Sequence, residues 1–268
     1  NDNSGGFPSE LCSKSDETSL QNMKGILEKY ANEQIVISGK LEGQSFLVVP
    51  VFKKLFFKEN LVSAYVCSRN SAYKREDKSL FWSMMRKYKI IDTMKKIWKQ
   101  EHKAYILQGE QVGPGIQDNI YDFKQNHWYL FRAKDYATLK QYFFEEQAAI
   151  AEKFGIRSVP LLTNEAIKGK TLKEIMPNIE AAVALAEKAV WEPTENDNIR
   201  SYFIDENTQG KLWKDYMQHE GIVVHTENYD KDNGIGVSFK VKNYDYNERG
   251  LNKIHKDCIE YKKAKNFK

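Results

Sequence analysis

Lys40 is the residue with the clearest capacity for chemistry in this sequence, together with the neighbouring Glu42 and Gly43. It stands between two apolar runs, 34–37 and 46–49, which predict buried strands with the lysine at the end of the first. A neutral lysine amine is a nucleophile, and a lysine in this position is costly to bury unless it is used. A Lys-x-Glu-Gly string also arises by chance, and a surface lysine in a strand turn is the plainer interpretation of it alone.

Four further stretches put charged residues beside apolar strands, in order along the chain. Arg69 lies in Ser-Arg-Asn, and Glu110 ends Gln-Gly-Glu. Glu220 precedes Gly-Ile-Val-Val, and Lys240 and Lys242 alternate with apolar residues, which places both side chains on one face of a strand. The five stretches together supply one nucleophilic lysine, three carboxylates, an arginine and two more lysines.

The composition describes a folded chain. Of 268 residues, 41% are hydrophobic and 13% aromatic, which excludes a disordered protein. The net charge of +4 permits a nucleic-acid partner without requiring one. Cys12, Cys67 and Cys258 are far apart and include no Cys-x-x-Cys pair, so we expect reduced thiols in an intracellular, cytoplasmic protein. The sequence contains neither a signal peptide nor an apolar run of about 18 residues, so we expect no membrane partner.

Apolar periodicity predicts strands and helices in irregular order. Helical spacing covers 19–31, 79–91, 136–154 and 171–191, with Ser19 as a cap for the first and Asp92 as the cap of a further helix. Strands are expected at 34–37, 46–49, 65–67, 104–107, 127–131, 221–224 and 237–241, with a hairpin edge at 52–60, a charged loop at 71–78 and a turn at 229–236. This order predicts an α+β fold of mixed and antiparallel sheets with flanking helices.

The same patterns suggest how the chain is organised. We expect a polar N-terminal arm at 1–18, one main domain at 19–250 with a surface loop or insertion at 192–210, and a C-terminal tail at 251–268.

The five stretches resemble the nucleotidyltransferase motifs of ATP-dependent RNA ligases, in the superfamily that also holds DNA ligases and mRNA capping enzymes. The likeness runs from about Lys40 to Asn243. Its most specific part is Glu-Gly-Ile-Val-Val at 220–224 followed by Ser-Phe-Lys-Val-Lys at 238–242. The segments 67–70 and 107–119 resemble the branch typified by a deinococcal enzyme. The resemblance implies the covalent nucleotidyltransferase fold.

The resemblance also implies roles for individual residues. Lys40 is the nucleophile that takes AMP from ATP, and Glu42 and Glu220 hold a divalent metal, Mg²⁺ or Mn²⁺, near the phosphates. By the same resemblance, a phosphate approaches closely at Gly43, Glu110 accepts hydrogen bonds from the ribose hydroxyls, and adenine stacks on Phe131. Arg69 contacts AMP or the RNA end, and Lys240 and Lys242 hold the phosphates. A core position for Phe131 and a solvated turn for Glu42 remain open. Seven other basic residues suit RNA phosphates, although charge runs are usually solvated faces: Lys53, Lys54, Lys58, Lys74, Arg75, Lys87 and Lys89.

The activity implied is sealing of an RNA 5′-phosphate to a 3′-hydroxyl through a lysyl-AMP intermediate, in repair of nicked or broken duplexes. A DNA ligase, a capping guanylyltransferase and a catalytically degenerate RNA-binding module are the alternatives. The sequence departs from the family at Gly39, where relatives often carry glutamate, and at Glu42, where aspartate is common. Ligases of this superfamily generally carry a second module, for which the segment before Lys40 is short, so we expect the catalytic domain alone.

Overall fold

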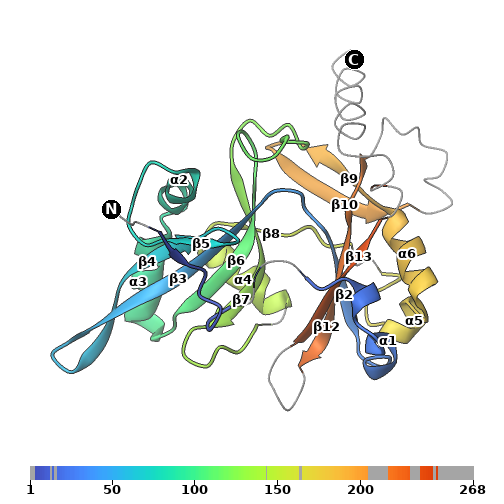
Figure 1. Cartoon of the computed structure of the whole chain (residues 1–268), viewed down its shortest axis with the longest axis horizontal. Coiled ribbons are helices and arrows are strands. Elements are labelled where there is room, and N and C mark those ends of the chain that lie inside the picture. The colour runs from blue at the N-terminus through green and yellow to red at the C-terminus, as the bar shows by residue number, and fades with distance from the viewer. Residues whose placement is uncertain are drawn as a thin grey trace. The chain divides into compact units, whose positions relative to one another are not determined.

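The computed structural model describes residues 4–12, 14, 17–142, 144–162, 165–204, 217–229, 236–243 and 246. The chain divides into two compact units, whose elements are labelled in Figure 1. Unit 1 comprises 1–16, 43–112 and 126–158, and unit 2 comprises 17–42, 113–125 and 159–268. Three sheets with short helices in the described residues confirm the predicted α+β class. The predicted tail at 251–268 lies outside those residues.

Unit 1 is built on a seven-stranded sheet in the order β1-β5-β4-β3-β6-β7-β8. Its neighbouring strands are antiparallel, except for the parallel pair β7 and β8. The strands are β1 (Ser4–Gly6), β3 (Gln44–Leu55), β4 (Lys58–Cys67), β5 (Ser71–Tyr73), β6 (Tyr105–Val112), β7 (His127–Asp135) and β8 (Arg157–Ser158). Strand β5 replaces the start of the charged loop expected at 71–78, because it pairs with β1 from the N-terminal segment.

Successive side chains of β3 point to opposite faces of the sheet and pack into two different cores. Phe46 and Val48 face a large cluster that also takes apolar residues from three helices, α2 (Leu80–Lys87), α3 (Ile90–Glu101) and α4 (Phe144–Lys153). Leu47 and Val49 face a smaller cluster on the other side, which includes the buried Cys12. Both faces of β3 are therefore buried near its start, and this fixes the register of the sheet.

The helices of unit 1 differ from prediction at their ends. Ser79 caps α2, since its hydroxyl accepts a hydrogen bond from the N–H of Trp82 at 3.4 Å. The predicted cap of α3 was wrong, because the helix begins at Ile90 and Asp92 lies inside its first turn. Lys89 adopts a left-handed conformation with φ of 48° and is the residue directly before the helix. The helix therefore starts before Asp92. Helix α4 is shorter than the segment expected at 136–154.

Unit 2 contains two three-stranded sheets. One has the order β13-β12-β2 and the other β10-β9-β11. The strands are β2 (Ile35–Gly39), β9 (Ala189–Thr194), β10 (Asn198–Phe203), β11 (Met217–Gln218), β12 (Gly221–Tyr229) and β13 (Gly236–Lys242). Helix α6 (Ile179–Glu187) packs against β12 and β13, and α5 (Leu172–Ile175) packs against α1 (Ile26–Lys29).

Sequence patterns overestimated helix in unit 2. The helix expected at 19–31 is a short 3₁₀ turn, η1 (Leu20–Asn22), followed by α1, because Gly25 between them is left-handed with φ of 73°. The segment 171–191 holds two helices and the start of β9 instead of one helix. The surface loop expected at 192–210 was wrong over 192–203, where β9 and β10 pair as a hairpin. Residues 205–210 lie outside the described residues.

No helix in the described part of the chain is long and apolar enough to cross a membrane.

Gly109 in β6 has no room for a side chain. A Cβ atom at this position would overlap the carbonyl oxygen of Tyr129 and the indole nitrogen of Trp128. We expect Gly109→Ala to lower the free energy of unfolding by about 1–3 kcal/mol, because strand backbone cannot move aside without breaking its ladder. Chemical denaturation measures the loss. The matched control is Gly6→Ala in β1, which meets nothing within 4 Å and should change stability little. Equal stability of the two variants would contradict the packing argument.

Candidate active site

Lys40 extends the β2 strand of unit 2 by one residue. Its backbone N–H donates to the carbonyl oxygen of Gly221 at 3.0 Å, directly beyond the pair formed by Gly39 and Ile222. The lysine thus lies at the end of a strand, as the sequence predicted. Its backbone is fixed by β12, and its half-buried side chain leaves the sheet at the start of that strand.

Three lysines share one face of the β13-β12-β2 sheet. Gly221 pairs with Lys242 and Val223 with Lys240, so both lysine side chains lie on the face that the register also gives to Lys40. The opposite face carries the buried residues Ile35, Ile37, Ile222, Val224, Phe239 and Val241, which pack into the core of unit 2. The core therefore orients the sheet and directs all three amines away from it.

Glu220 forms an ion pair with Lys40. The Nζ atom of Lys40 contacts the Oε2 atom of Glu220, and the two side chains are 24% and 25% exposed. An ammonium group that donates to a carboxylate has no lone pair available for attack. The pair therefore holds the amine in place but must separate before the amine can act as a nucleophile.

The carboxylate of Glu42 lies in the same cluster. Its Oε2 accepts a hydrogen bond from the hydroxyl of Tyr246, and its backbone N–H donates to the hydroxyl of Tyr121 at 2.8 Å. Burial raises the pKa of Glu42, the bond from Tyr246 lowers it, and the charges of Glu220 and Asp118 raise it further. Burial and the nearby carboxylates thus disfavour the ionised form of Glu42. A bound cation would stabilise that form.

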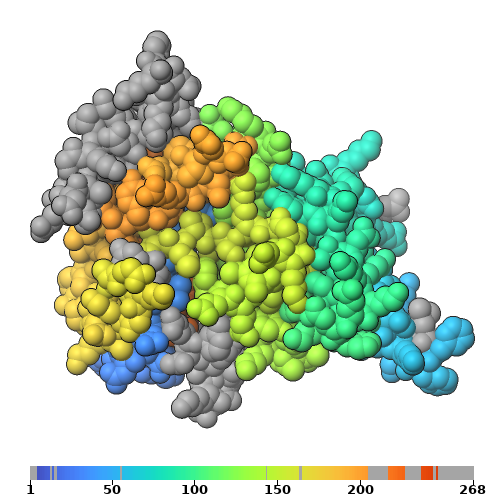
Figure 2. Space-filling view, turned by 180° about the vertical axis from the view of Figure 1, so that it is seen from behind, coloured from blue at the N-terminus to red at the C-terminus, as the bar shows by residue number. Residues whose placement is uncertain are grey.

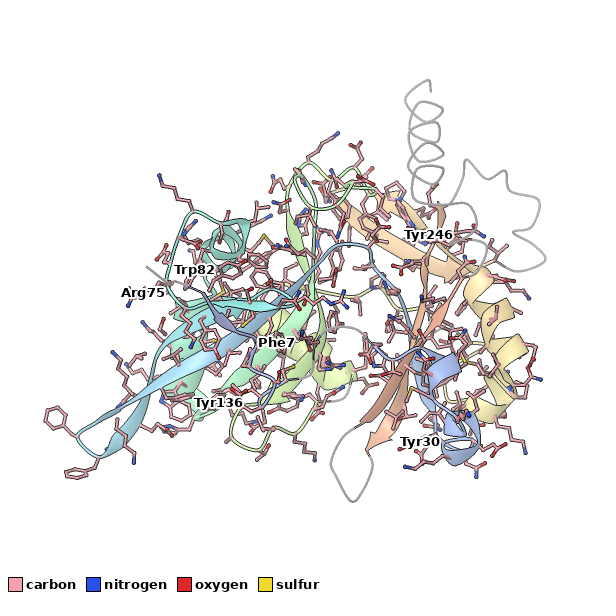
Figure 3. All side chains as sticks on the ribbon, viewed as in Figure 1. Phe7, Tyr30, Arg75, Trp82, Tyr136 and Tyr246 are labelled. Carbon is pink, nitrogen blue, oxygen red and sulfur yellow. The ribbon has the colours of Figure 1, made fainter. Side chains whose placement is uncertain are left out.

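Two tyrosines that sequence patterns did not single out position Glu42. Tyr121 is buried and packs against Trp191, with ring centroids 4.8 Å apart. Tyr246, labelled in Figure 3, is buried, and its backbone N–H donates to Oδ1 of Asn243 at 3.2 Å. Burial is the main cause that raises the pKa of Tyr246, so its hydroxyl stays protonated and donates. Nothing in the local sequence indicates either contact, because both join segments far apart in the chain.

His219 explains the departure at Gly39. A Cβ atom on Gly39 would overlap the imidazole ring of His219, so the ring occupies the space that a side chain would need. The ring is buried, and its Nε2 lies 2.8 Å from the hydroxyl of Ser201. Burial lowers the pKa of His219 to about 4, and the charge of Lys40 acts in the same direction, while contact with the Lys40 backbone opposes it. His219 is therefore neutral at pH 7 and packs against the strand that ends beside Lys40.

The remaining four predicted site residues belong to unit 1. Gly43 packs on β6, where a Cβ atom would lie 2.9 Å from Cγ of Glu110, so Gly43 and Glu110 are neighbours. Glu110 is half-buried near the end of β6, and Arg69 is exposed on the turn between β4 and β5.

Phe131 occupies a bulge in β7. Leu130 pairs with Gly109 and Arg132 pairs with Gln108, so Phe131 is the extra residue between them. Its side chain is half-buried and absent from the fully buried core of unit 1. A bulge changes the direction in which a side chain points. The bulge therefore weighs against a core position for Phe131.

No preformed cluster of three or more His, Cys, Asp or Glu side chains that could hold a metal ion occurs among the described residues. Magnesium commonly takes one or two protein carboxylates and completes its shell with water and phosphate oxygens. Glu42 and Glu220 fit that pattern, because burial and the charge of Glu220 both raise the pKa of Glu42, and a bound cation would offset that cost. Their assignment to a metal stays a prediction.

Comparison with known proteins supplies independent findings. The sequence model of the RNA ligase family matches residues 33–242. Among solved structures, a mutant of the Naegleria gruberi RNA ligase without ligand matches at a TM-score of 0.63 and 22% identity, over 92% of this chain. A mutant of that ligase with ATP and Mn matches at a TM-score of 0.63 and 23% identity, over 94% of this chain. The ligase with PPi matches at a TM-score of 0.63 and 22% identity, over 92% of this chain. This chain spans 60% of the length of those ligases. No curated protein matches the sequence.

Packing of His219 against Gly39 predicts strong coupling between the two positions. We expect Gly39→Ala to lower the free energy of unfolding by about 1–3 kcal/mol, because the new methyl group collides with a buried ring. In a His219→Ala background the same change should be neutral or stabilising, since alanine suits a strand better than glycine. Chemical denaturation of the four proteins gives the coupling energy. Additive effects would show that the two residues do not share this space.

Proposed function

The chain belongs to the RNA ligase family, and we propose that it is an ATP-dependent RNA ligase that acts through a covalent AMP adduct on Lys40. The observation that carries this proposal is the sheet face of unit 2 on which Lys40, Lys240 and Lys242 stand together, with Glu220 in contact with Lys40. A nucleophile flanked by two cations and a carboxylate suits attack on a nucleotide phosphate.

The first step forms the adduct. Lys40 parts from Glu220 and loses a proton to water, and its Nζ lone pair attacks the α-phosphorus of ATP. A nitrogen–phosphorus bond forms, the bond from that phosphorus to the bridging oxygen breaks, and pyrophosphate leaves with the electron pair. Lys240 and Lys242 stabilise negative charge on the phosphate oxygens from the same sheet face. Solved structures of the Naegleria gruberi ligase with ATP and Mn, and with PPi, support this choice of substrate and product.

The next two steps join the RNA ends. An oxygen of an RNA 5′-phosphate attacks the phosphorus of the adduct, the nitrogen–phosphorus bond breaks, and Lys40 recovers its amine. A 3′-hydroxyl then attacks the activated 5′-phosphate, AMP leaves, and the new phosphodiester bond seals the strand. We assign Glu110 to the ribose hydroxyls, Phe131 to adenine stacking and Arg69 to AMP or the RNA end. The bulge at Phe131 and the exposure of Arg69 support these assignments.

Glu42 and Glu220 would hold Mg²⁺ or Mn²⁺, which supplies positive charge against the phosphate oxygens. The raised pKa of Glu42 supports this assignment, because burial and neighbouring carboxylates disfavour its ionised form on its own. Tyr246 keeps one oxygen of Glu42 engaged, so the other oxygen is the one available for a cation.

The finer features of the activity belong to the same proposal. We assign RNA repair at nicked or broken duplexes in the cytoplasm, and kinship with the deinococcal-type branch. A DNA ligase, a capping guanylyltransferase and a catalytically degenerate RNA-binding module are the competing functions. Labelling with GTP instead of ATP would favour the capping enzyme, and equal sealing of a nick with DNA on the 3′-hydroxyl side would favour the DNA ligase. RNA binding without any adduct would favour the binding module.

Removal of the nucleophile is the direct test. We expect the wild-type chain to acquire label from ATP labelled at the α-phosphate in the presence of Mg²⁺ or Mn²⁺, and Lys40→Ala to acquire none, since no other group replaces the amine. Denaturing gel electrophoresis detects the covalent product. Lys170→Ala, at an exposed lysine of the same unit, should label like the wild type. Label retained on Lys40→Ala would refute the assignment of the nucleophile.

Glu220 is tested by the metal dependence of labelling. We expect Glu220→Gln to raise the Mn²⁺ concentration for half-maximal labelling about tenfold or more, because a neutral amide binds a divalent cation more weakly than a carboxylate. Labelling measured across a Mn²⁺ titration gives this value. The control is Glu180→Gln, at an exposed carboxylate in α6, which should leave the midpoint unchanged. An unchanged midpoint in Glu220→Gln, with labelling reduced at all metal concentrations, would assign Glu220 to Lys40 alone.

A further inference from the structure

Phe56 and Phe57 form the tip of the β3–β4 hairpin, and their side chains are 96% and 104% exposed. The other exposed large apolar residues in the described part of the chain are only 37–43% exposed. Two adjacent phenylalanines contribute nothing to a core from this position. Exposure of this kind marks an interaction surface more often than a packing defect.

The backbone of the tip makes this choice of residues more unusual. Phe56 and Phe57 are the two central residues of the turn, and both have positive φ, 49° and 66°. Two-residue hairpin turns of this kind favour Asn-Gly, because residues with a bulky side chain are strained in this region. Folding alone would therefore select against both phenylalanines, so their presence points to a role in binding.

The hairpin is a ribbon that extends past its sheet. Strand β3 pairs with β6 over Gln44–Val48, whereas its pairing with β4 continues to the tip at Leu55 and Lys58. Figures 1 and 2 show the ribbon, in light blue, standing out from the rest of unit 1. Its base is held by Phe52, whose ring lies 4.9 Å from the ring of Trp98 and 4.9 Å from that of Tyr136, which Figure 3 labels. The arm is thus anchored at its base and presents its tip to solvent.

Lysines flank the aromatic pair. Lys53, Lys54 and Lys58 are all exposed. Alternation places Lys53 on the face of the ribbon opposite Phe52, and the register brings Lys58 to that same face. Lys54 lies on the Phe52 face, opposite Glu59. One face of the arm therefore carries two lysines just behind two exposed rings.

We propose that the β3–β4 hairpin is an RNA-binding arm on which Phe56 and Phe57 stack against unpaired bases while Lys53 and Lys58 contact the flanking phosphates. Exposed aromatic rings beside cations are the elements of a single-strand binding surface, since every base offers a face for stacking. The choice of RNA over a lipid surface rests on the proposed ligase function. The arm deepens that function by giving the chain a contact with its polymeric substrate besides the nucleotide site.

The test replaces the two phenylalanines with the residues that the turn prefers. Fluorescence anisotropy measures binding of a labelled single-stranded RNA of about 12 nucleotides, within the range of such sites. We expect F56N/F57G to bind about tenfold or more weakly, because stacking is lost. Its melting temperature should equal or exceed that of the wild type, since Asn-Gly relieves the strained turn. Unchanged RNA affinity in this variant would overturn the proposal.

The lysines have a separate signature in salt. We expect K53A/K58A to reduce the slope of log affinity against log salt concentration by about 1.4, at roughly 0.7 for each phosphate contact with a single strand. The charge-matched control K168A/K170A, at exposed lysines of unit 2, should keep the wild-type slope. A slope that falls equally in both variants would show a diffuse charge effect and overturn the role of the two lysines.

Two further outcomes separate this inference from its alternatives. Wild-type protein that forms no AMP adduct, combined with weaker RNA binding by F56N/F57G, would refute the ligase function and support the arm. Wild-type protein that forms the adduct, combined with equal RNA binding by both, would refute the arm and leave the ligase function standing. Sedimentation with phosphatidylserine–phosphatidylcholine vesicles that depends on the two phenylalanines, with RNA affinity unchanged, would assign the tip to a membrane and overturn the proposal.

Discussion

The register of one short sheet is the constraint that places Lys40 on the same face as Lys240 and Lys242. The hydrogen bond from the N–H of Lys40 to the carbonyl oxygen of Gly221 continues the pairing of β2 with β12, and β13 adds Lys240 and Lys242 on the other side of β12. A slip of one residue would turn these side chains toward the core. Such a slip is opposed because the other face of all three strands carries buried apolar residues that pack into the core of unit 2. Hydrophobic burial on one face thus fixes the position of charge on the other.

Packing behind the site is as specific as the charges in front of it. Gly39 and Gly221 approach their neighbours so closely that a Cβ atom on either would overlap another group, the ring of His219 or the carbonyl oxygen of Val241. His219 stays neutral because burial lowers its pKa to about 4. A glutamate at position 39 would need both the space that the ring fills and a partner for its charge. The departure from the family pattern at Gly39 is therefore consistent with a different neighbour and does not indicate a damaged site.

Features with a local cause could be predicted from the sequence. The strand that ends beside Lys40, the helix that follows Ser79 and the α+β class follow from composition and periodicity along short segments. Features set by distant partners could not be predicted. The hydrogen bonds from Tyr246 and to Tyr121 at Glu42 cross 204 and 79 positions of the chain. Strand β5 depends on both kinds of partner, since it pairs with the neighbouring β4 and with the distant β1. Helix was overestimated where a left-handed glycine, Gly25, interrupts otherwise helical spacing.

Charges of both signs lie close together around Lys40. Three lysines on one sheet face repel each other, and burial together with the charges of Glu220 and Asp118 raises the pKa of Glu42. Contact between Lys40 and Glu220 offsets part of both costs. A triphosphate would attract the lysines more strongly than one carboxylate does, and the released carboxylates would then be free to bind a divalent cation. Under the proposed function, a triphosphate would compete with Glu220 for the Lys40 amine, so nucleotide binding and separation of this ion pair would be coupled.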